Sequence, residues 1–260
     1  MIFIYAFIAV MILMTILWVV SIPLKNVSIV DIFWGIGFIV ANSTYFLLSG
    51  EFYTRKLIVF VLVTLWGLRL SGYLLFRNYG KEEDFRYQEF RRHFGAERYW
   101  WFSFFQVFLL QGSLIALVSL PLLGVNTNTE ANDMNVLDYL AVVVWLIGFL
   151  FESIGDYQLS KFKSNPDNKG KVLDTGLWRF TRHPNYFGDA AVWWSFALFS
   201  MASGAYWYII GSLIMTYLII KISGVSLLEK SLSDTKPKYR DYVSKTSSFF
   251  PWFPKKSKLW

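Results

Sequence analysis

The sequence contains no cysteine and only two histidines, His93 and His183. The absence of cysteine excludes disulfide bonds, thiolate zinc sites, iron–sulfur clusters and a cysteine nucleophile. Two histidines are too few for a histidine-rich di-iron centre, so we expect no metal site. The glycine-rich Rossmann fingerprint is also missing and no alternating strand pattern occurs, so any nucleotide cofactor has to bind between helices.

Charged side chains are scarce as well. They make up 17% of the chain, whereas 55% of the residues are hydrophobic, 20% are aromatic and 12 are tryptophan. The charges gather in a few stretches instead of spreading along the chain as on a soluble surface. This composition is typical of a multi-pass membrane protein. The net charge of +7 then reflects topology and contact with anionic lipid headgroups, and nucleic-acid binding is not expected.

Seven segments are apolar enough, or nearly so, to cross a bilayer as helices of about 20 residues. They are residues 2–22, 29–49, 57–76, 103–124, 136–156, 187–203 and 205–223. The first lacks a basic n-region and a small-residue cleavage site before Pro23, which favours a retained helix over a signal peptide. The last two are joined by little more than Ser203 and Gly204, which predicts a tight antiparallel hairpin. We expect an all-α integral membrane protein with about seven transmembrane helices, forming one domain over residues 1–260 with a C-terminal catalytic core over about 136–254.

The distribution of lysine and arginine predicts the orientation. Residues 77–102 and 157–186 hold six basic residues each and the tail after 223 holds eight, whereas residues 125–135 hold none. With seven spans, the three basic segments lie on one side of the membrane, as the positive-inside rule requires. The N-terminus is therefore expected outside, with the C-terminus and a cofactor pocket on the cytoplasmic side.

Six ionisable residues lie within the apolar segments or at their ends, where a charge costs at least about 2–3 kcal/mol on insertion scales. They are Asp31, Arg69, Glu152, Asp156, Asp189 and Lys221. Such residues normally face a partner or a polar cavity. Asp31 either lies at headgroup level beside Trp34 or has such a partner. Arg69 either snorkels to the interface or pairs with Asp31 or Glu152.

Two pairs of polar residues have the spacing of one helical turn. Glu152 and Asp156 are four residues apart, and so are Asn185 and Asp189. Two carboxylates this close repel each other unless one is protonated or a cation or hydrogen-bond donor lies between them. The four groups either cap and solvate helix ends or line one cavity.

The stretch "TRHPNYFGD" places cations next to the predicted start of a helix. Pro184 suits the first turn, where no backbone donor is lost. The free N–H groups of that turn attract anions, and Arg179, Arg182 and His183 add positive charge. The stretch therefore predicts a phosphate or carboxylate site, with topology or lipid headgroups as the alternative role of the arginines.

The tail after the seventh segment combines aromatic and basic residues. Phe249 to Phe253 form an aromatic "FFPWF" that is typical of a belt lying at the membrane surface. Glu229, Tyr239 and Tyr242 precede this belt and are candidates to close over a ligand.

These segments resemble a known family. "TRHPNYFGD", "GDYQLSKFK" and "SGVSLLEKSL…YRDYVSKTSSFFPWFP", with "DIFWG" and "LWGLRLSGYLLFRN", are similar to the bacterial membrane family called domain of unknown function 1295 (DUF1295). That family is placed in the superfamily of steroid 5-alpha-reductases and isoprenylcysteine carboxyl methyltransferases. The resemblance covers most of the chain. It implies an enzyme of a bacterial cytoplasmic membrane that uses NADPH or S-adenosylmethionine.

The reductase branch implies roles for particular residues. By this resemblance Asp156, Lys163, Asn185 and Asp189 hold NADPH, and the segment from Glu229 to Tyr242 closes over it.

The proton donor departs from the reductase pattern. That branch carries a proton-donating tyrosine three residues before an arginine, where this chain has Trp66 before Arg69. Because tryptophan is not a useful proton donor, Asp31, Tyr73 or Tyr79 is expected to replace it.

The methyltransferase branch shares an Arg-His-Pro-x-Tyr-x-Gly core, matched here from Arg182 to Gly188 and including His183 and Tyr186. Members of that branch commonly carry paired acids in the tail, where this chain has Glu229 followed by Lys230.

Our hypothesis is an NADPH-dependent reductase of a conjugated carbon–carbon double bond in a hydrophobic enone, such as a steroid, sterol or terpenoid. The expected catalytic residues are Asp31, Arg69 and Tyr73. The expected cofactor-binding residues are Glu152, Asp156, Lys163, Arg179, Arg182, His183, Asn185, Tyr186, Asp189, Glu229, Tyr239 and Tyr242. The alternatives are an S-adenosylmethionine-dependent methyltransferase of a lipid or prenylated substrate, and a non-catalytic lipid-binding membrane protein.

Overall fold

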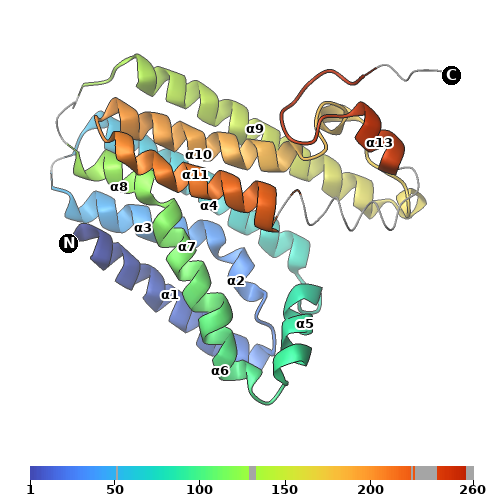
Figure 1. Ribbon diagram of the computed structural model, residues 1–260. Helices are drawn as coiled ribbons and strands as arrows, with labels where there is room; N and C mark the ends of the chain where they lie inside the picture. The colour runs from blue at the N-terminus through green and yellow to red at the C-terminus, as the bar shows by residue number, and fades with distance from the viewer. Residues whose placement is uncertain (51, 129–132, 224, 226–238, 256–260) are drawn as a thin grey trace. The chain divides into compact units, whose positions relative to one another are not determined.

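The structure is a computed structural model that describes the chain except for residues 51, 129–132, 224, 226–238 and 256–260. Helices account for nearly all of the regular structure in the described residues (Figure 1), and the one β-bridge there joins Thr181 to Ser247. The all-α prediction is therefore confirmed for this part of the chain.

The helices follow the apolar segments of the sequence. The α-helices are α1 (Ile2–Leu24), α2 (Ile29–Ile32), α3 (Trp34–Leu48), α4 (Thr54–Asn78), α5 (Phe85–Phe94), α6 (Tyr99–Ser103), α7 (Leu110–Val118), α8 (Leu120–Thr127), α9 (Val136–Ser164), α10 (Pro184–Ala202), α11 (Ile210–Tyr217) and α13 (Tyr239–Lys245). The π-helices η1 (Phe104–Leu109) and η5 (Leu218–Ser223) and the 3-10 helices η2 (Pro166–Asn168), η3 (Gly176–Arg179) and η4 (Tyr206–Ile209) complete them.

Four helical stretches among the described residues are long and apolar enough to cross a membrane. They are Ile2–Leu24, Thr54–Asn78, Tyr99–Val118 and Val136–Ser164. Shorter apolar helices cover Trp34–Leu48 and Tyr206–Ile222. Each of the seven predicted segments is largely helical, but the number of membrane crossings and their orientation stay predictions.

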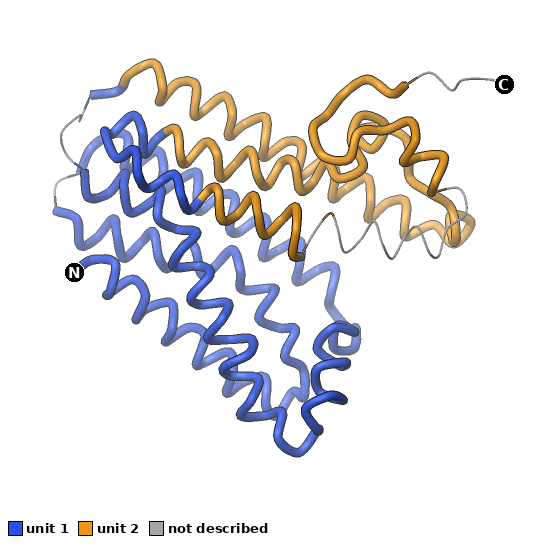
Figure 2. The backbone as a smooth tube through the Cα atoms, viewed as in Figure 1, with its two compact units in different colours: residues 1–134, 199–211 blue, residues 135–198, 212–260 orange. Residues whose placement is uncertain are grey.

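The chain divides into two compact units (Figure 2). Unit 1 consists of Met1–Met134 and Phe199–Gly211, and unit 2 of Asn135–Leu198 and Ser212–Trp260. The start of unit 2 is close to the predicted start of the C-terminal core at residue 136. The division into compact units does not test the prediction of a single domain.

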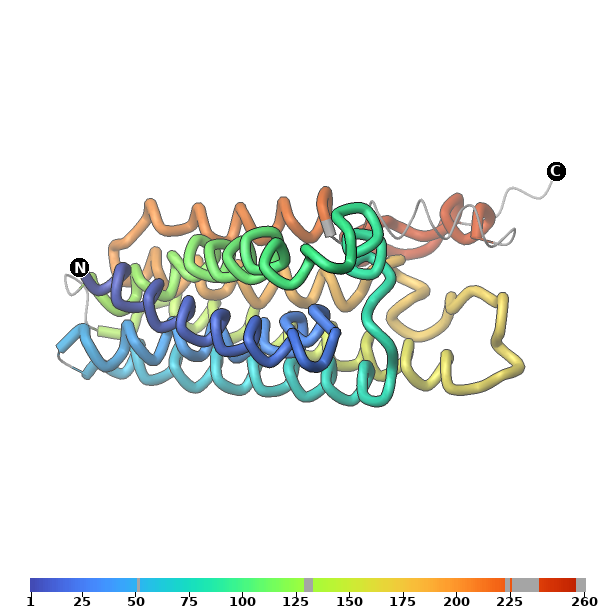
Figure 3. The backbone as a smooth tube through the Cα atoms, turned by 90° about the horizontal axis from the view of Figure 1, so that it is seen from below, coloured from blue at the N-terminus to red at the C-terminus, as the bar shows by residue number. Residues whose placement is uncertain are grey.

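In unit 1, α1, α3 and α4 lie side by side (Figures 1 and 3). The contact between α3 and α4 depends on two facing glycines, because a Cβ on Gly67 would lie 2.7 Å from the carbonyl oxygen of Gly35. Small residues of this kind let membrane helices pack closely. Trp66 is fully buried beside this contact, with its ring 5.7 Å from that of Phe38.

In unit 2, α9 begins with a capping box. The Asn135 Oδ1 accepts from the N–H of Leu137 at 2.9 Å, and the Asp138 Oδ2 accepts from the N–H of Asn135 at 2.8 Å. Such a cap satisfies N–H groups that a helix start otherwise leaves without partners.

Helix α10 packs against both α9 and α11. A Cβ on Gly148 of α9 would lie 2.7 Å from the carbonyl oxygen of Gly188 on α10. On its other side, the Ser212 hydroxyl donates to the carbonyl of Trp193 at 2.6 Å, as expected for the predicted hairpin of α10 and α11. One predicted cofactor-binding residue lies at this contact, since a Cβ on Gly188 would meet the backbone nitrogen of Glu152.

Candidate functional site

The predicted site residues fall into two sets, one in each unit. Asp31, Arg69 and Tyr73, predicted as catalytic, belong to unit 1. The predicted cofactor-binding residues belong to unit 2, and among them Glu229 lies outside the described residues. Their roles stay predictions, but the structure gives many of them definite neighbours.

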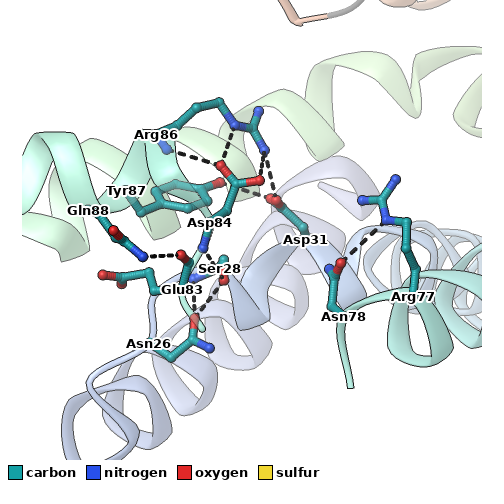
Figure 4. A network of polar contacts seen from close by, with 10 residues as sticks. All are labelled: Asn26, Ser28, Asp31, Arg77, Asn78, Glu83, Asp84, Arg86, Tyr87 and Gln88. Atoms are coloured by element: carbon teal, nitrogen blue, oxygen red, sulfur yellow. Dashed lines mark hydrogen bonds and ion pairs between the residues drawn. The ribbon is translucent and has the colours of Figure 1, made fainter. Parts of the chain in front are cut away.

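Asp31 on α2 is held by two residues of α5 (Figure 4). Its Oδ2 lies 3.2 Å from the Arg86 Nη2, and its Oδ1 accepts a hydrogen bond of 2.8 Å from the Tyr87 hydroxyl. Tyr87 is buried, and the side chain of Gln111 on α7 hydrogen-bonds the same hydroxyl. A carboxylate, a guanidinium and a phenol thus meet at one point of unit 1.

Helix α5 is fixed in this position by its N-terminal residues. Asp84 caps the helix by accepting from the N–H of Arg86 at 3.1 Å, and it also pairs with the Arg86 Nε at 2.9 Å. Glu83 accepts two hydrogen bonds from Arg91, at 2.8 and 3.0 Å, and one from the N–H of Val27 at 2.7 Å. These bonds join α5 to the turn between α1 and α2.

The charges in this cluster shift the pKa values of its members. Burial raises the pKa of Tyr87, and the neighbouring Asp31 carboxylate raises it further, so the phenol keeps its proton at neutral pH. For Asp84, burial raises the pKa, but the hydrogen bonds and charge of Arg86 outweigh it and the net pKa is lowered. The pKa of Arg86 is raised: burial lowers it, but Asp84 and Asp31 more than compensate.

The lowered pKa of Asp84 predicts an acid-sensitive contribution to stability. The pKa in the folded chain lies below the ordinary value of 3.8, so the contribution is fully present above that value and is lost as pH falls through the folded value. We expect Asp84→Asn to lower the thermal unfolding midpoint at pH 7, and the difference from the native protein to shrink below about pH 4. Tryptophan fluorescence in mild detergent measures both midpoints.

The exposed neighbour Glu82 provides the control for this pH series. Glu82→Gln removes one carboxylate from the same loop and should leave the midpoint unchanged throughout. A difference for Asp84→Asn that is as large at pH 3 as at pH 7 would show that the carboxylate charge is not what stabilises α5.

Arg69 and Tyr73 lie one turn apart on α4. The Tyr73 ring lies between two arginines, with the Arg69 Cζ 6.0 Å and the Arg77 Cζ 5.7 Å from its centroid. These are cation–π contacts, in which the negative face of the ring attracts the guanidinium groups.

In unit 2, one stripe of α9 carries the predicted polar residues. At 3.6 residues per turn, Glu152, Asp156 and Lys163 fall within about 40° of one another around the helix axis. Glu152 and Asp156 are buried and Lys163 is exposed. The stripe therefore runs from buried acids to an exposed cation.

Asn185 on α10 meets this stripe. Its Nδ2 donates to the Asp156 Oδ1 at 3.0 Å, so two of the four groups predicted to share a cavity are in direct contact. In the described part of the chain, the buried Asn185 Oδ1 has no hydrogen-bond partner. A buried amide oxygen left this way is costly, and a ligand that supplies an N–H or O–H group would remove the cost.

Other predicted residues of unit 2 have neighbours of their own. Asp189 follows Asn185 by one turn on α10. His183 is buried, and its ring stacks on that of Tyr186 at 5.6 Å. Tyr239 is buried on α13, with its ring 5.9 Å from that of Tyr242.

The loop before α10 binds the C-terminal segment of the chain. The Arg182 Nη1 donates to the carbonyls of Val243 and Thr246, at 3.1 and 2.5 Å, at the end of α13. The Tyr242 hydroxyl donates to the Trp178 carbonyl, and the N–H of Arg182 donates to the carbonyl of Ser247 at 2.9 Å. Arg182, which the sequence suggests as an anion ligand, thus has a structural task at a helix C-terminus.

A cleft of about 490 Å³ lies beside this loop in unit 2. Its lining residues are Lys171, Val172, Asp174, Arg179, Asp241, Tyr242, Lys245, Thr246 and Pro254. Arg179, another predicted anion ligand, therefore faces a cleft to which the α9 stripe contributes no lining residue.

Sequence reasoning missed Tyr87 and Arg86. They lie in the basic segment 77–102, whose charges predict membrane topology. Their partner Asp31 is more than 50 residues away in the sequence. The only local signal was Asp84, a good N-cap residue directly before an aromatic and charged run.

The fold is that of an all-helical protein with several helices able to cross a membrane. The chain belongs to the family described as "Protein of unknown function (DUF1295)", which it matches over residues 17–246. It is 30% identical over 269 residues to "Uncharacterized protein C594.04c" of the fission yeast Schizosaccharomyces pombe, covering 92% of this chain and 77% of that protein. No solved structure matches it. Because this relative is from a yeast, a bacterial membrane stays a prediction.

Proposed function

We propose that the protein is an NADPH-dependent reductase of a conjugated carbon–carbon double bond in a hydrophobic enone. The observation that carries the proposal is Asn185, whose Nδ2 is fixed by Asp156 while its buried Oδ1 has no hydrogen-bond partner among the described residues. A carboxamide or a ribose hydroxyl supplies the missing donor. The residues present therefore fit the donor-bearing groups of NADPH.

The α9 stripe suits the rest of such a cofactor. Asp156 and Lys163 are seven residues apart, about 10 Å along the helix axis. Asp156 would accept from a ribose hydroxyl, and Lys163 would supply positive charge for phosphates. When bound, NADPH supplies a hydride.

The proposed reaction also requires an acid. Reduction of an enone consumes a proton as well as a hydride. The Tyr87 hydroxyl, which donates to the Asp31 Oδ1, would leave this hydrogen bond to give its proton to the enolate, and the phenolate would take up a proton from water. Arg86 places positive charge beside Asp31, with its Nη2 3.2 Å from the Asp31 Oδ2. Tyr87 thus takes the role for which the sequence suggested Asp31, Tyr73 or Tyr79.

Binding of NADPH to the purified protein tests the proposal. We expect saturable binding, followed by energy transfer from tryptophan, and a dissociation constant raised about 10- to 100-fold in Asn185→Ala, since one buried hydrogen bond is lost. Asn165→Ala is the matched control, because Asn165 is an exposed asparagine of the same unit. It should leave the dissociation constant unchanged.

Two outcomes would contradict the proposal. Binding of S-adenosylmethionine without affinity for NADPH would favour a methyltransferase, to which the Arg182–Gly188 core is also similar. Binding of neither cofactor would favour a non-catalytic lipid-binding protein.

We further propose that all seven apolar segments cross the membrane, with the N-terminus outside and the C-terminus in the cytoplasm. The concentration of basic residues in 77–102, in 157–186 and after 223 supports this topology. The apolar side chains exposed along α1, such as Ile8, Ile12 and Ile16, suit contact with lipid.

A further inference from the structure

The cleft of unit 2 carries charges of both signs. Three cations, Lys171, Arg179 and Lys245, line it together with two acids, Asp174 and Asp241. These charges are exposed, whereas Tyr242 and Thr246 in the same lining are buried. Three positive minus two negative charges leave a net charge of +1. A site for a simple anion would gain nothing from two carboxylates, because they repel the ligand.

The cleft adjoins an exposed aromatic surface. Phe250, Trp252 and Phe253 are 70%, 73% and 76% exposed, and Pro254, which follows them, lines the cleft. The Phe250 ring lies 6.2 Å from that of Phe187, in the first turn of the apolar helix α10. Exposed aromatic rings at the end of an apolar helix are typical of the lipid headgroup region. A cleft beside such rings is expected at the level of the headgroups.

We propose that the cleft binds the headgroup of an ethanolamine phospholipid. Its phosphodiester carries one negative charge, which matches Lys171, Arg179 and Lys245. Its ammonium group carries one positive charge and three N–H donors, which match Asp174 and Asp241. The exposed rings of Trp252 and Phe253 then contact the acyl chains. This lipid site does not include Asn185, Asp156 or Lys163, on which the proposed reductase rests.

Native mass spectrometry of the full-length protein in mild detergent tests the lipid site. Ethanolamine, choline and glycerol phospholipids with the same acyl chains are added at equal concentrations. We expect the ethanolamine lipid to be retained about fivefold more than the other two, since choline has no N–H donor and glycerol has no positive charge. Equal retention of the three lipids would overturn the proposal.

Variants separate the two halves of the site. The double variant Asp174→Asn and Asp241→Asn should abolish the preference for ethanolamine while the phosphate is still held. Lys171→Gln with Lys245→Gln should lower the retention of all three lipids about fivefold. Lys169→Gln, which removes an exposed lysine outside the cleft, is the matched control and should change nothing.

Two further measurements complete the test: the thermal unfolding midpoint of each variant and the displacement of the lipid by nucleotides. An unchanged thermal unfolding midpoint in each variant shows that the C-terminal segment stays folded. Displacement of the lipid by NADPH or by adenosine 2′,5′-bisphosphate would mean that the cleft is part of a cofactor site, and this would overturn the lipid assignment without contradicting the proposed reductase.

Discussion

Gly188→Ala is expected to destabilise unit 2 by about 3 kcal/mol or more, because it overpacks a contact between two helix backbones. A Cβ at this position would lie 2.5 Å from the carbonyl oxygen of Gly148 and would also meet the backbone nitrogen of Glu152. Backbone atoms inside α9 cannot move aside as the end of a flexible side chain does. The two helices therefore have to separate, and the contact between Asp156 and Asn185 is weakened with them.

The loss is measured as a fall in the thermal unfolding midpoint of the detergent-purified protein. Gly72→Ala is the matched control, because Gly72 is an exposed helical glycine with no heavy atom within 4 Å of an added Cβ. It should stabilise α4 slightly, by up to about 1 kcal/mol, since alanine is the better helix former. Equal midpoints for Gly188→Ala and the native protein would mean that α9 and α10 pack less closely than the 2.5 Å between an added Cβ and the Gly148 carbonyl oxygen indicates.

The helices were predictable because membrane spans are encoded locally. A run of about 20 apolar residues is a sufficient signal, and the helices α1, α4 and α9 follow such runs closely. The capping box of α9, Asn135 with Asp138, uses the same kind of local information. Helical spacing also predicted that Glu152 and Asp156 share one face of α9.

The partners of the polar residues were less predictable. Spacing within one helix cannot show that Asp31 faces Arg86 and Tyr87, because that contact joins residues 55 and 56 positions apart. Arg182 illustrates the same limit. Its sequence context of basic residues beside a helix start favours an anion, but carbonyls 61 and 64 residues away accept its hydrogen bonds. Chemistry that depends on tertiary contacts needed the structure.

Tyr87→Phe is expected to lower the rate of enone reduction about 100- to 10,000-fold, the range typical of a lost general acid. Phenylalanine keeps the ring that packs in unit 1 but removes the hydroxyl that donates to the Asp31 Oδ1. Because burial and Asp31 raise the pKa of Tyr87, the native phenol is protonated at neutral pH, and its hydrogen bond to Asp31 has to break before the proton passes to the enolate. NADPH binding should be unchanged, since the residues proposed to contact NADPH are Asn185, Asp156 and Lys163.

Three matched variants decide which tyrosine donates the proton. Tyr73→Phe keeps the ring between Arg69 and Arg77, and Tyr79→Phe alters a side chain that is 82% exposed. Single-turnover reduction of a steroid 4-en-3-one by each NADPH-loaded variant is compared with the native rate. We expect a large loss for Tyr87→Phe and less than about twofold for the other two, because neither removes the donor to Asp31. A loss confined to Tyr73→Phe would assign the proton donor to Tyr73 on α4. If the native protein binds NADPH but does not reduce the steroid, the proposed cofactor site stands and the enone is rejected as the substrate.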